Sequence, residues 1–350
     1  MSAQHRDPLA RPRVSDLGIT LGAFSRGPLN AITDVPGVRI GHRTITGEGL
    51  NTGVTAIVPE PLGPERRMLP AGLCVGNGYG KMIGVSQILE LGAIETPILL
   101  TSTLSAFRVA DALVSHVIAQ PGYEKTTTLN PVVGETNDGF LSDIRARRIT
   151  EGDVFAALGE ASDGPVPEGA VGAGTGTVAL GYKGGIGTAS RRVAIGAEEY
   201  TVGAIVQSNF TGTLTVAGVP LPATELLDTT PAETIGNSCM IVVATDAPLD
   251  ARQLGRVARR AVFAMRAVGA DYAQGSGDYA ITFSVGQGTP PNDELLSPTF
   301  QATMDAVEEA LLNSVFAGVD TEGFEGRSAA GLPLDDAIAR LRAAGVAATD

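Results

Sequence analysis

The sequence predicts an α/β protein in which apolar strands alternate with amphipathic helices. The C-terminal third carries the clearest pattern: apolar runs at residues 240–244 and 279–285 flank a helical repeat from about 250 to 269, which is the spacing of a βαβ unit. The chain has 350 residues, of which 43% are hydrophobic, enough for one large core. Its 45 glycines and lack of Trp indicate small side chains and close backbone contacts inside that core.

The N-terminal half alternates in the same way. Residues 30–41 read as two short strands around the turn at residues 34–37. A helix is expected over residues 81–92, and another from about 105 to 119 with Phe107 on its inner face. Further strands are expected at residues 52–58, 72–75 and 95–100, and a short strand feeding a polar turn at 131–146.

The C-terminal half completes the pattern. Apolar strands over residues 193–210 end at Asn209, and residues 211–237 are weakly patterned and read as loop. After the βαβ unit, helices are expected at 304–317 and 334–343. We interpret residues 1–28 as a polar N-terminal extension and residues 29–350 as a single catalytic domain.

Composition and charge exclude several classes of function. The net charge of −13 argues against nucleic acid as a partner, because neutralising phosphates requires a basic surface. No apolar run approaches the ~18 residues of a membrane-spanning helix, and the first residues lack the apolar core of a signal peptide. Cys74 and Cys239 fit neither a disulfide framework nor a metal site. We therefore expect a cytoplasmic protein with no metal and no cofactor.

A Gly-rich stretch at residues 169–192 raises the alternative of a non-enzymatic nucleotide-binding protein. Its run Gly172-Ala173-Gly174-Thr175-Gly176 does not meet the GxGxxG requirement after a strand, and no GxxxxGK[ST] sequence occurs. The glycines are better explained by close backbone packing and by turns with positive φ.

Ser238, at the head of the run GNSCMIVVAT, is the candidate nucleophile. A serine hydroxyl is a poor nucleophile until a base takes its proton, and the chain holds only three histidines, none beside a reactive-looking serine. One candidate base is the α-amine of Ser238 itself, released by cleavage after Asn237, because an α-amine titrates near ~7.7–8.0. The ordinary interpretation remains a serine that simply begins a strand.

The βαβ spacing predicts which residues lie near Ser238. If the two strands are parallel neighbours, the run Gly275-Ser276-Gly277-Asp278 lies beside Ser238 at the same sheet edge. Ser276 and Asp278 then join the candidate site, although such a run is also an ordinary turn. Cys239 points to the opposite face of its strand and reads as a small buried residue.

Three further polar residues are candidates. Asn209, at a strand end, either caps a turn or donates its side-chain amide to an oxyanion. Glu135 lies with Asn137 in a polar stretch that reads as a solvated turn. Alternatively, the Glu135 carboxylate receives a substrate ammonium.

Together these segments resemble the DmpA-type aminopeptidases (L-aminopeptidase D-Ala-esterase/amidases), a family that includes the β-peptidyl aminopeptidases. The resemblance covers roughly residues 25–330. The motifs that carry it, in order, are NAITDVPGVRIGH (30–42), NTGVTAIVP (51–59), GNG (76–78), VVGETNDGFLSDI (132–144), VGAGTG with YKGGIGTASR (171–191), VQSNF (206–210), GNSCM (236–240) and GSGDY (275–279).

The resemblance implies a four-layer αββα sandwich of the N-terminal-nucleophile type, similar to ornithine acetyltransferase. It also implies cleavage between Asn237 and Ser238 into an α chain of 1–237 and a β chain of 238–350, and a homotetramer of αβ units. In the residue roles it implies, Ser238 is the nucleophile, Ser276 and Asp278 support it, and Asn209 binds the oxyanion. Glu135 holds the amine of a small peptide or amide substrate, and Asn137 is a further pocket residue.

The resemblance has one departure and leaves one further alternative. Asp278 stands where the β-peptidyl members have Glu, which shortens the reach of the acid by one methylene. An acyltransferase of the ornithine acetyltransferase type is similar in fold and self-cleavage, but it carries Thr at the junction. Ser238 therefore favours the hydrolase.

Overall fold

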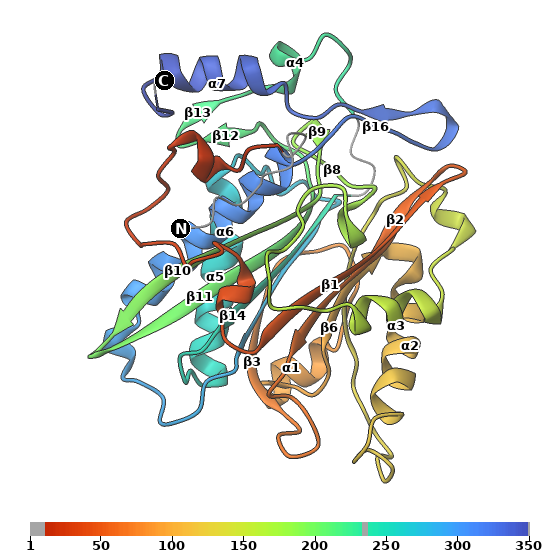
Figure 1. Ribbon diagram of the computed structural model, residues 1–350, viewed down its shortest axis with the longest axis vertical. Coiled ribbons are helices and arrows are strands. Elements are labelled where there is room, and N and C mark those ends of the chain that lie inside the picture. The colour runs from red at the N-terminus through yellow and green to blue at the C-terminus, as the bar shows by residue number, and fades with distance from the viewer. Residues whose placement is uncertain (1–10, 233–236, 349–350) are drawn as a thin grey trace.

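Two β-sheets stacked face to face form the centre of the computed structural model, which describes residues 11–232 and 237–348 (Figure 1). The five-stranded sheet has the order β1 (Val38–Gly47), β2 (Leu50–Pro59), β6 (Ile98–Ser102), β7 (Val132–Thr136), β4 (Met82–Ile83). The six-stranded sheet has the order β10 (Ile186–Ile195), β11 (Glu198–Asn209), β14 (Ser238–Thr245), β15 (Gly277–Ser284), β3 (Leu69–Gly78), β5 (Ala93–Ile94).

Helices cover the outer face of each sheet. In Figure 1, α5 (Ala251–Ala267) and α6 (Ser297–Phe316) lie on one side of the pair of sheets, and α2 (Ala106–Ile118) and α3 (Glu151–Gly159) lie on the other. Apolar clusters fill all three spaces between the layers. The predicted four-layer αββα sandwich is confirmed.

Strand β14 lies in the middle of the six-stranded sheet and is covered on both faces, which accounts for its nearly continuous apolar sequence. Its even-numbered residues Met240 and Val242 pack between the sheets, whereas Cys239 and Val243 pack against the layer of α5 and α6. A strand covered on both faces buries every side chain, so it reads as an uninterrupted apolar run. All eight residues of β14 are buried.

The helices that cover the six-stranded sheet begin in different ways. Helix α5 starts after Asp250, whose side chain accepts from the N–H of Gln253 at 2.7 Å, a cap that agrees with the predicted start. Helix α6 begins at Ser297, well before the predicted residue 304, with a proline in its first turn. Proline tolerates that position because its missing N–H would have no partner there.

Several expectations for the N-terminal half were wrong. Residues Ile32–Asp34 form a 3₁₀ turn, and β1 then runs unbroken from Val38, so there are not two short strands around residues 34–37. Helix α1 covers only Val85–Leu91, because Gly84 and Gly92 bound it with positive φ. Phe107 is 66% exposed, so it lies outside the inner face of α2.

Short elements occupy regions that were expected to be irregular. Residues 211–232 contain two short strands and a one-turn helix, which corrects the expectation of a loop there, and residues 233–236 lie outside the described residues. The remaining short elements are β8 (Val178–Ala179), β9 (Tyr182–Lys183), β12 (Thr215–Val216), β13 (Val219–Pro220), α4 (Ala223–Leu226), β16 (Thr321–Glu322) and β17 (Ser328–Ala329). The last helix, α7 (Leu334–Ala343), has the predicted bounds.

The segment that precedes the first sheet packs against α6. Val14 and Ile19 belong to the same buried cluster as that helix. Nearby, the guanidinium of Arg191 and the carboxylate of Glu309 form an ion pair of 2.6 Å with both side chains fully buried, and Asn30 donates to the same carboxylate. Within the described parts of the chain, no helix has the length and apolar character needed to cross a bilayer.

Candidate active site

The predicted parallel pair of strands forms the floor of the site. β14 and β15 run parallel, with Ser238 in register with Gly277, and β11 pairs antiparallel on the other side of β14, with Asn209 opposite Ser238. The starts of two strands and the end of a third therefore meet at one edge of the six-stranded sheet. The predicted convergence of Ser238 with residues 275–278 is confirmed.

Ser238 is almost fully buried and faces the space between the sheets. Its Oγ has no hydrogen-bond partner among the described residues. Cys239 projects to the opposite face, into the core with α5, and burial raises the pKa of its thiol well above its usual value. The interpretation of Cys239 as a small core residue is confirmed, and of the two residues only Ser238 lines the pocket.

Ser276 and Asp278 form a buried pair just beyond Ser238. The Ser276 hydroxyl donates to Asp278 Oδ1 at 2.8 Å, while Asp278 Oδ2 has no partner among the described residues. Burial raises the pKa of Asp278 to about 6, the Ser276 hydrogen bond opposes the rise, and the nearby Asp271 adds to it. This pair makes no hydrogen bond to Ser238 Oγ.

Alternation along the strands explains the missing contact. Asp278 is in register with Cys239, so its side chain leaves the sheet on the helix-covered face, opposite to that of Ser238. The Ser276–Asp278 pair therefore lies beside the backbone at the start of β14.

The side-chain amide of Asn209 has a defined orientation. Its Oδ1 accepts from the N–H of Val178 at 3.1 Å. Because the oxygen is used there, the Nδ2 donors are directed away from Val178. Asn209 lies directly opposite Ser238 in the pairing of β11 with β14.

The peptide that joins Asn237 to Ser238 is held on both sides. The Asn237 carbonyl oxygen accepts from the backbone N–H of Gly277 at 3.1 Å. The side chain of Asn237 donates to Thr211 Oγ1 at 2.8 Å, and that hydroxyl donates to Asp271 at 2.8 Å. A backbone donor on the carbonyl oxygen polarises this bond toward nucleophilic attack.

A cavity of about 250 Å³ opens onto this peptide. The residues that line it are Tyr79, Lys81, Thr103, Leu104, Glu135, Asn137, Asn237, Ser238 and Gly275. Ser276, Asp278 and Asn209 do not line the cavity, so the candidate residues divide into a pocket group and a group behind it. No histidine is among the lining residues; His42 and His116 lie in β1 and α2, and His5 lies outside the described residues.

Glu135 projects from β7 of the other sheet into this cavity. Its carboxylate is almost fully buried and accepts from the backbone N–H of Lys81 at 2.8 Å, with the Lys81 ammonium 3.6 Å from the same oxygen. Asn137 follows in the turn, where its side-chain oxygen accepts from Gly139. The two residues thus lie in the wall of a pocket, and the interpretation as a solvated turn was wrong.

Lys81, Tyr79, Thr103 and Leu104 were not predicted from the sequence. The first two belong to the run GNGYGK (76–81), which begins in the last three residues of β3, and only its glycines carried a recognisable signal. Asp138, next to Asn137, is also buried: it accepts from the Ser102 hydroxyl at 2.8 Å, and burial raises its pKa to about 6. It lies behind the pocket wall and does not line the cavity.

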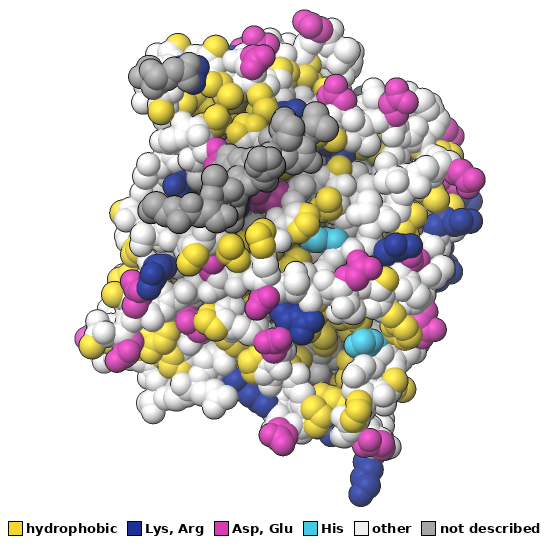
Figure 2. Space-filling model, viewed as in Figure 1, with side chains coloured by type: hydrophobic (Ala, Val, Ile, Leu, Met, Phe, Trp, Pro, Cys, Tyr) yellow, Lys and Arg dark blue, Asp and Glu magenta, His cyan; other side chains and the backbone are white. Residues whose placement is uncertain are grey.

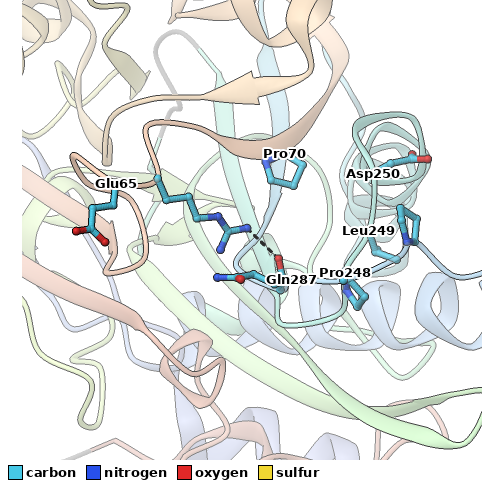
Figure 3. A pocket seen from close by; sticks show the side chains of 10 residues that line it. Glu65, Pro70, Pro248, Leu249, Asp250 and Gln287 are labelled. Carbon is cyan, nitrogen blue, oxygen red and sulfur yellow. Dashed lines mark hydrogen bonds between the residues drawn. The ribbon is translucent and has the colours of Figure 1, made fainter. Parts of the chain in front are cut away.

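A larger hollow of about 670 Å³ lies at the other end of the same strands, lined by Glu65, Pro70, Pro248 and Gln287 among others (Figure 3). Arg66 in its wall donates to the carbonyl oxygens of Val285 and Gly286. β14 has eight residues, so this hollow is separated from Ser238 by roughly 20 Å or more. It contains none of the predicted site residues.

The Gly-rich stretch is used for packing. A Cβ on Gly176 would lie 2.0 Å from the Asn51 carbonyl oxygen, and one on Gly174 would lie 2.4 Å from the Ile186 nitrogen. These glycines let the 3₁₀ turn at Gly172–Gly174 lie directly against the sheets. The close packing predicted for these glycines is therefore confirmed.

Comparison with known proteins agrees with this geometry. The family model described as Peptidase family S58 matches residues 30–329. The chain belongs to this family. Curated relatives include the β-peptidyl aminopeptidases BapA of Sphingosinicella xenopeptidilytica and of Sphingosinicella microcystinivorans, each 37% identical over 95% of this chain and over 91% and 92% of the relative, respectively.

Solved structures extend the similarity to the fold. The L-aminopeptidase D-Ala-esterase/amidase of Ochrobactrum anthropi, described as a variant of the Ntn hydrolase fold, is 35% identical with a TM-score of 0.88 over 97% of this chain and 100% of its own. A Burkholderia sp. β-aminopeptidase is 38% identical with a TM-score of 0.87 over the same shares, and the PH0078 protein of Pyrococcus horikoshii OT3 is 40% identical with a TM-score of 0.89 over 95% and 99%.

The S58 membership establishes a serine-type aminopeptidase with the Ntn-hydrolase fold. It favours the hydrolase over the acyltransferase and over the non-enzymatic nucleotide-binding protein. Acidic and basic side chains are interspersed on the face shown in Figure 2.

Proposed function

We propose that this S58 peptidase cuts itself between Asn237 and Ser238 and then removes N-terminal residues from short peptides, amides or esters, with Ser238 as the nucleophile. The observation that carries the proposal is the shared cavity of about 250 Å³. It is lined both by Ser238, whose hydroxyl has no partner in the described part of the chain, and by the buried carboxylate of Glu135. A cavity of this size suits one terminal residue and the start of the next.

Self-cleavage would begin with attack of Ser238 Oγ on the Asn237 carbonyl carbon. The backbone N–H of Gly277 already bonds the carbonyl oxygen and would stabilise its developing charge. The C–N bond then breaks as the proton lost by Oγ is passed to the departing nitrogen, with Ser276 and Asp278 as its carriers, and an ester on Oγ and a free α-amine are left. Water hydrolyses the ester, which gives a carboxylate on Asn237 and restores the Ser238 hydroxyl.

Turnover would repeat the attack on a substrate, with the new α-amine as base. The neutral amine takes the Oγ proton as the oxygen attacks the scissile carbonyl, and passes it to the leaving amine. Asn209 donates to the oxyanion, and Ser276 with Asp278 orients the amine. Water then releases the acyl group, so that two chains, 1–237 and 238–350, serve one site.

Recognition of the substrate amine is assigned to Glu135, with Asn137 beside it. The carboxylate is nearly buried, so its attraction for an ammonium is screened less than at the surface. The names of the relatives cover L-aminopeptidase, D-Ala esterase/amidase and β-peptide activities. We infer the same substrate classes here, together with a cytoplasmic homotetramer of αβ units in which residues 29–350 are one domain and residues 1–28 an extension.

Intact mass spectrometry of wild type and Ser238→Ala tests the proposal. Wild type should give two chains divided after Asn237, and Ser238→Ala one chain of about 36 kDa. Cleavage of the variant at the same bond would remove Ser238 from its role. Glu135→Gln should lower kcat/KM for amine-bearing esters far more than for N-acetylated ones, and equal losses would contradict ammonium recognition.

A further inference from the structure

The cavity beside Ser238 contains a positive charge that amine recognition does not use. Of the residues that line it, Lys81 and Glu135 are the two that carry charge, and they are already close to each other. Asp138, the neighbouring carboxyl, bonds to Ser102 and does not line the cavity. In the uncut chain, the side chains that line the pocket therefore carry no net charge.

The loop that carries Lys81 is anchored at three consecutive residues. The N–H of Tyr79 donates to the Ser276 carbonyl oxygen at 3.1 Å, the Gly80 carbonyl oxygen accepts from the Tyr279 hydroxyl at 3.1 Å, and the N–H of Lys81 donates to Glu135 at 2.8 Å. The loop is thus joined to both sheets. The position of the Lys81 backbone does not depend on its charge.

The ammonium of Lys81 is held at the cavity and is also accessible from it. It donates to Thr103 Oγ1 at 2.7 Å, and the side chain remains 40% exposed. Thr103 supplies one acceptor for a group with three donors. The remaining donors are available to an acceptor that enters the cavity.

Amine binding disturbs this balance. A substrate ammonium on Glu135 brings a second positive charge next to Lys81, and like charges this close in a half-enclosed site oppose binding. A substrate with a carboxylate beside its amine restores the balance, because the carboxylate can accept from Lys81. We propose that Lys81 with Thr103 forms an anion subsite, which selects N-terminal residues that carry a free carboxylate together with the free amine.

The spacing of the subsites favours one arrangement of those groups. The ammonium of Lys81 lies 3.6 Å from the Glu135 oxygen, so the two subsites adjoin and suit an ammonium and a carboxylate on the same carbon. In a β-linked residue with a free amine, a carboxylate on the amine-bearing carbon makes that residue a β-linked aspartyl residue. An α-linked aspartyl residue has its carboxylate one carbon farther away. This inference rests on the proposed aminopeptidase function.

The test compares three p-nitroanilides with the mature enzyme: β-linked aspartyl, the same β-residue with methyl in place of the carboxylate, and α-linked aspartyl. Wild type should favour the β-aspartyl substrate over the methyl one in kcat/KM by roughly 10- to 100-fold, the range of a hydrogen bond between charged groups. The α-aspartyl substrate should fall between them. Lys81→Met keeps the backbone N–H and should abolish the preference.

Two further variants make the result specific to the charge. Lys81→Arg should restore most of the preference for the carboxylate, and Lys125→Met, which removes an exposed lysine that does not line the cavity, should leave it unchanged. Wild type that hydrolyses the methyl substrate as well as the β-aspartyl one would overturn the anion subsite alone. Wild type that hydrolyses none of the three would overturn the aminopeptidase proposal as well.

Discussion

Replacing Asp278 with Asn should stabilise the folded chain at neutral and alkaline pH. Burial raises the pKa of Asp278 from 3.8 to about 6, and its Oδ2 has no partner among the described residues. One pH unit corresponds to about 1.4 kcal/mol, so the ionised carboxylate costs the folded state about 3 kcal/mol. Asn keeps the acceptor for Ser276 but leaves its own amide without a partner, which reduces the expected gain to about 1–2 kcal/mol.

The pH dependence carries the test. The folded state binds the Asp278 proton more tightly than the unfolded chain does. The stabilisation that the protonated carboxyl gives to the folded state is therefore fully present below about pH 4, falls as pH rises toward about 6, and is absent above that pH. Asn does not titrate, so the Asp278→Asn variant does not lose this stabilisation as pH rises. Its free energy of unfolding relative to that of its parent should therefore be higher at pH 8 than at pH 4.

Urea unfolding measures this difference in a Ser238→Ala background, which keeps the compared chains intact. Free energies of unfolding at pH 4 and pH 8 are compared for the background and for the variant with Asp278→Asn, with exposed Asp163→Asn as the control. A difference of equal size at both pH values would refute the reasoning. So would a variant that loses stability relative to its parent at pH 8.

Two further substitutions separate turnover from self-cleavage. Asn209→Ala should lower kcat roughly 10²- to 10³-fold with little change in KM, which is the effect of losing one oxyanion donor. Stopped assays on mature enzyme measure both constants, and an unchanged kcat would exclude that role for Asn209. Thr211→Val removes the hydrogen bond from Asn237, worth about 1 kcal/mol, and should slow cleavage of the fresh precursor about fivefold on a denaturing gel, with a smaller effect on kcat. Equal effects on both rates would contradict a role confined to the precursor.

The parts of the fold that could be predicted are those with strong periodicity. The apolar run that became β14 and the amphipathic repeat that became α5 are correct because both faces of the strand and one face of the helix are buried. Phe107 was assigned to the wrong face, since a large apolar residue in a helix is not obliged to lie inward. The prediction of a strand at residues 32–34 was wrong for a local reason, because a 3₁₀ turn and a short strand can have similar amino-acid composition.

The site residues whose positions depend on strand topology could be predicted from the sequence, whereas those whose positions depend on loops could not. Ser238 and Gly277 meet because parallel neighbours start at the same edge, which spacing alone indicates. The opposite faces of Ser238 and Asp278 also follow from alternation, but only once the register is known. Lys81 could not have been found, because its role depends on hydrogen bonds that join an irregular segment to two sheets.

The location of β14 has a consequence for the two chains of the proposed mature enzyme. Chain ends ordinarily lie at the surface, yet this strand lies between β11 and β15 and starts at a buried residue. The new terminus would be sheltered from soluble acetyltransferases and exopeptidases. The α chain would contain the whole five-stranded sheet, but β14 and β15 of the β chain form the middle of the six-stranded sheet, and two buried clusters draw on both chains. The pair should therefore melt in one cooperative transition, and fragments expressed apart should not reach the native state without each other.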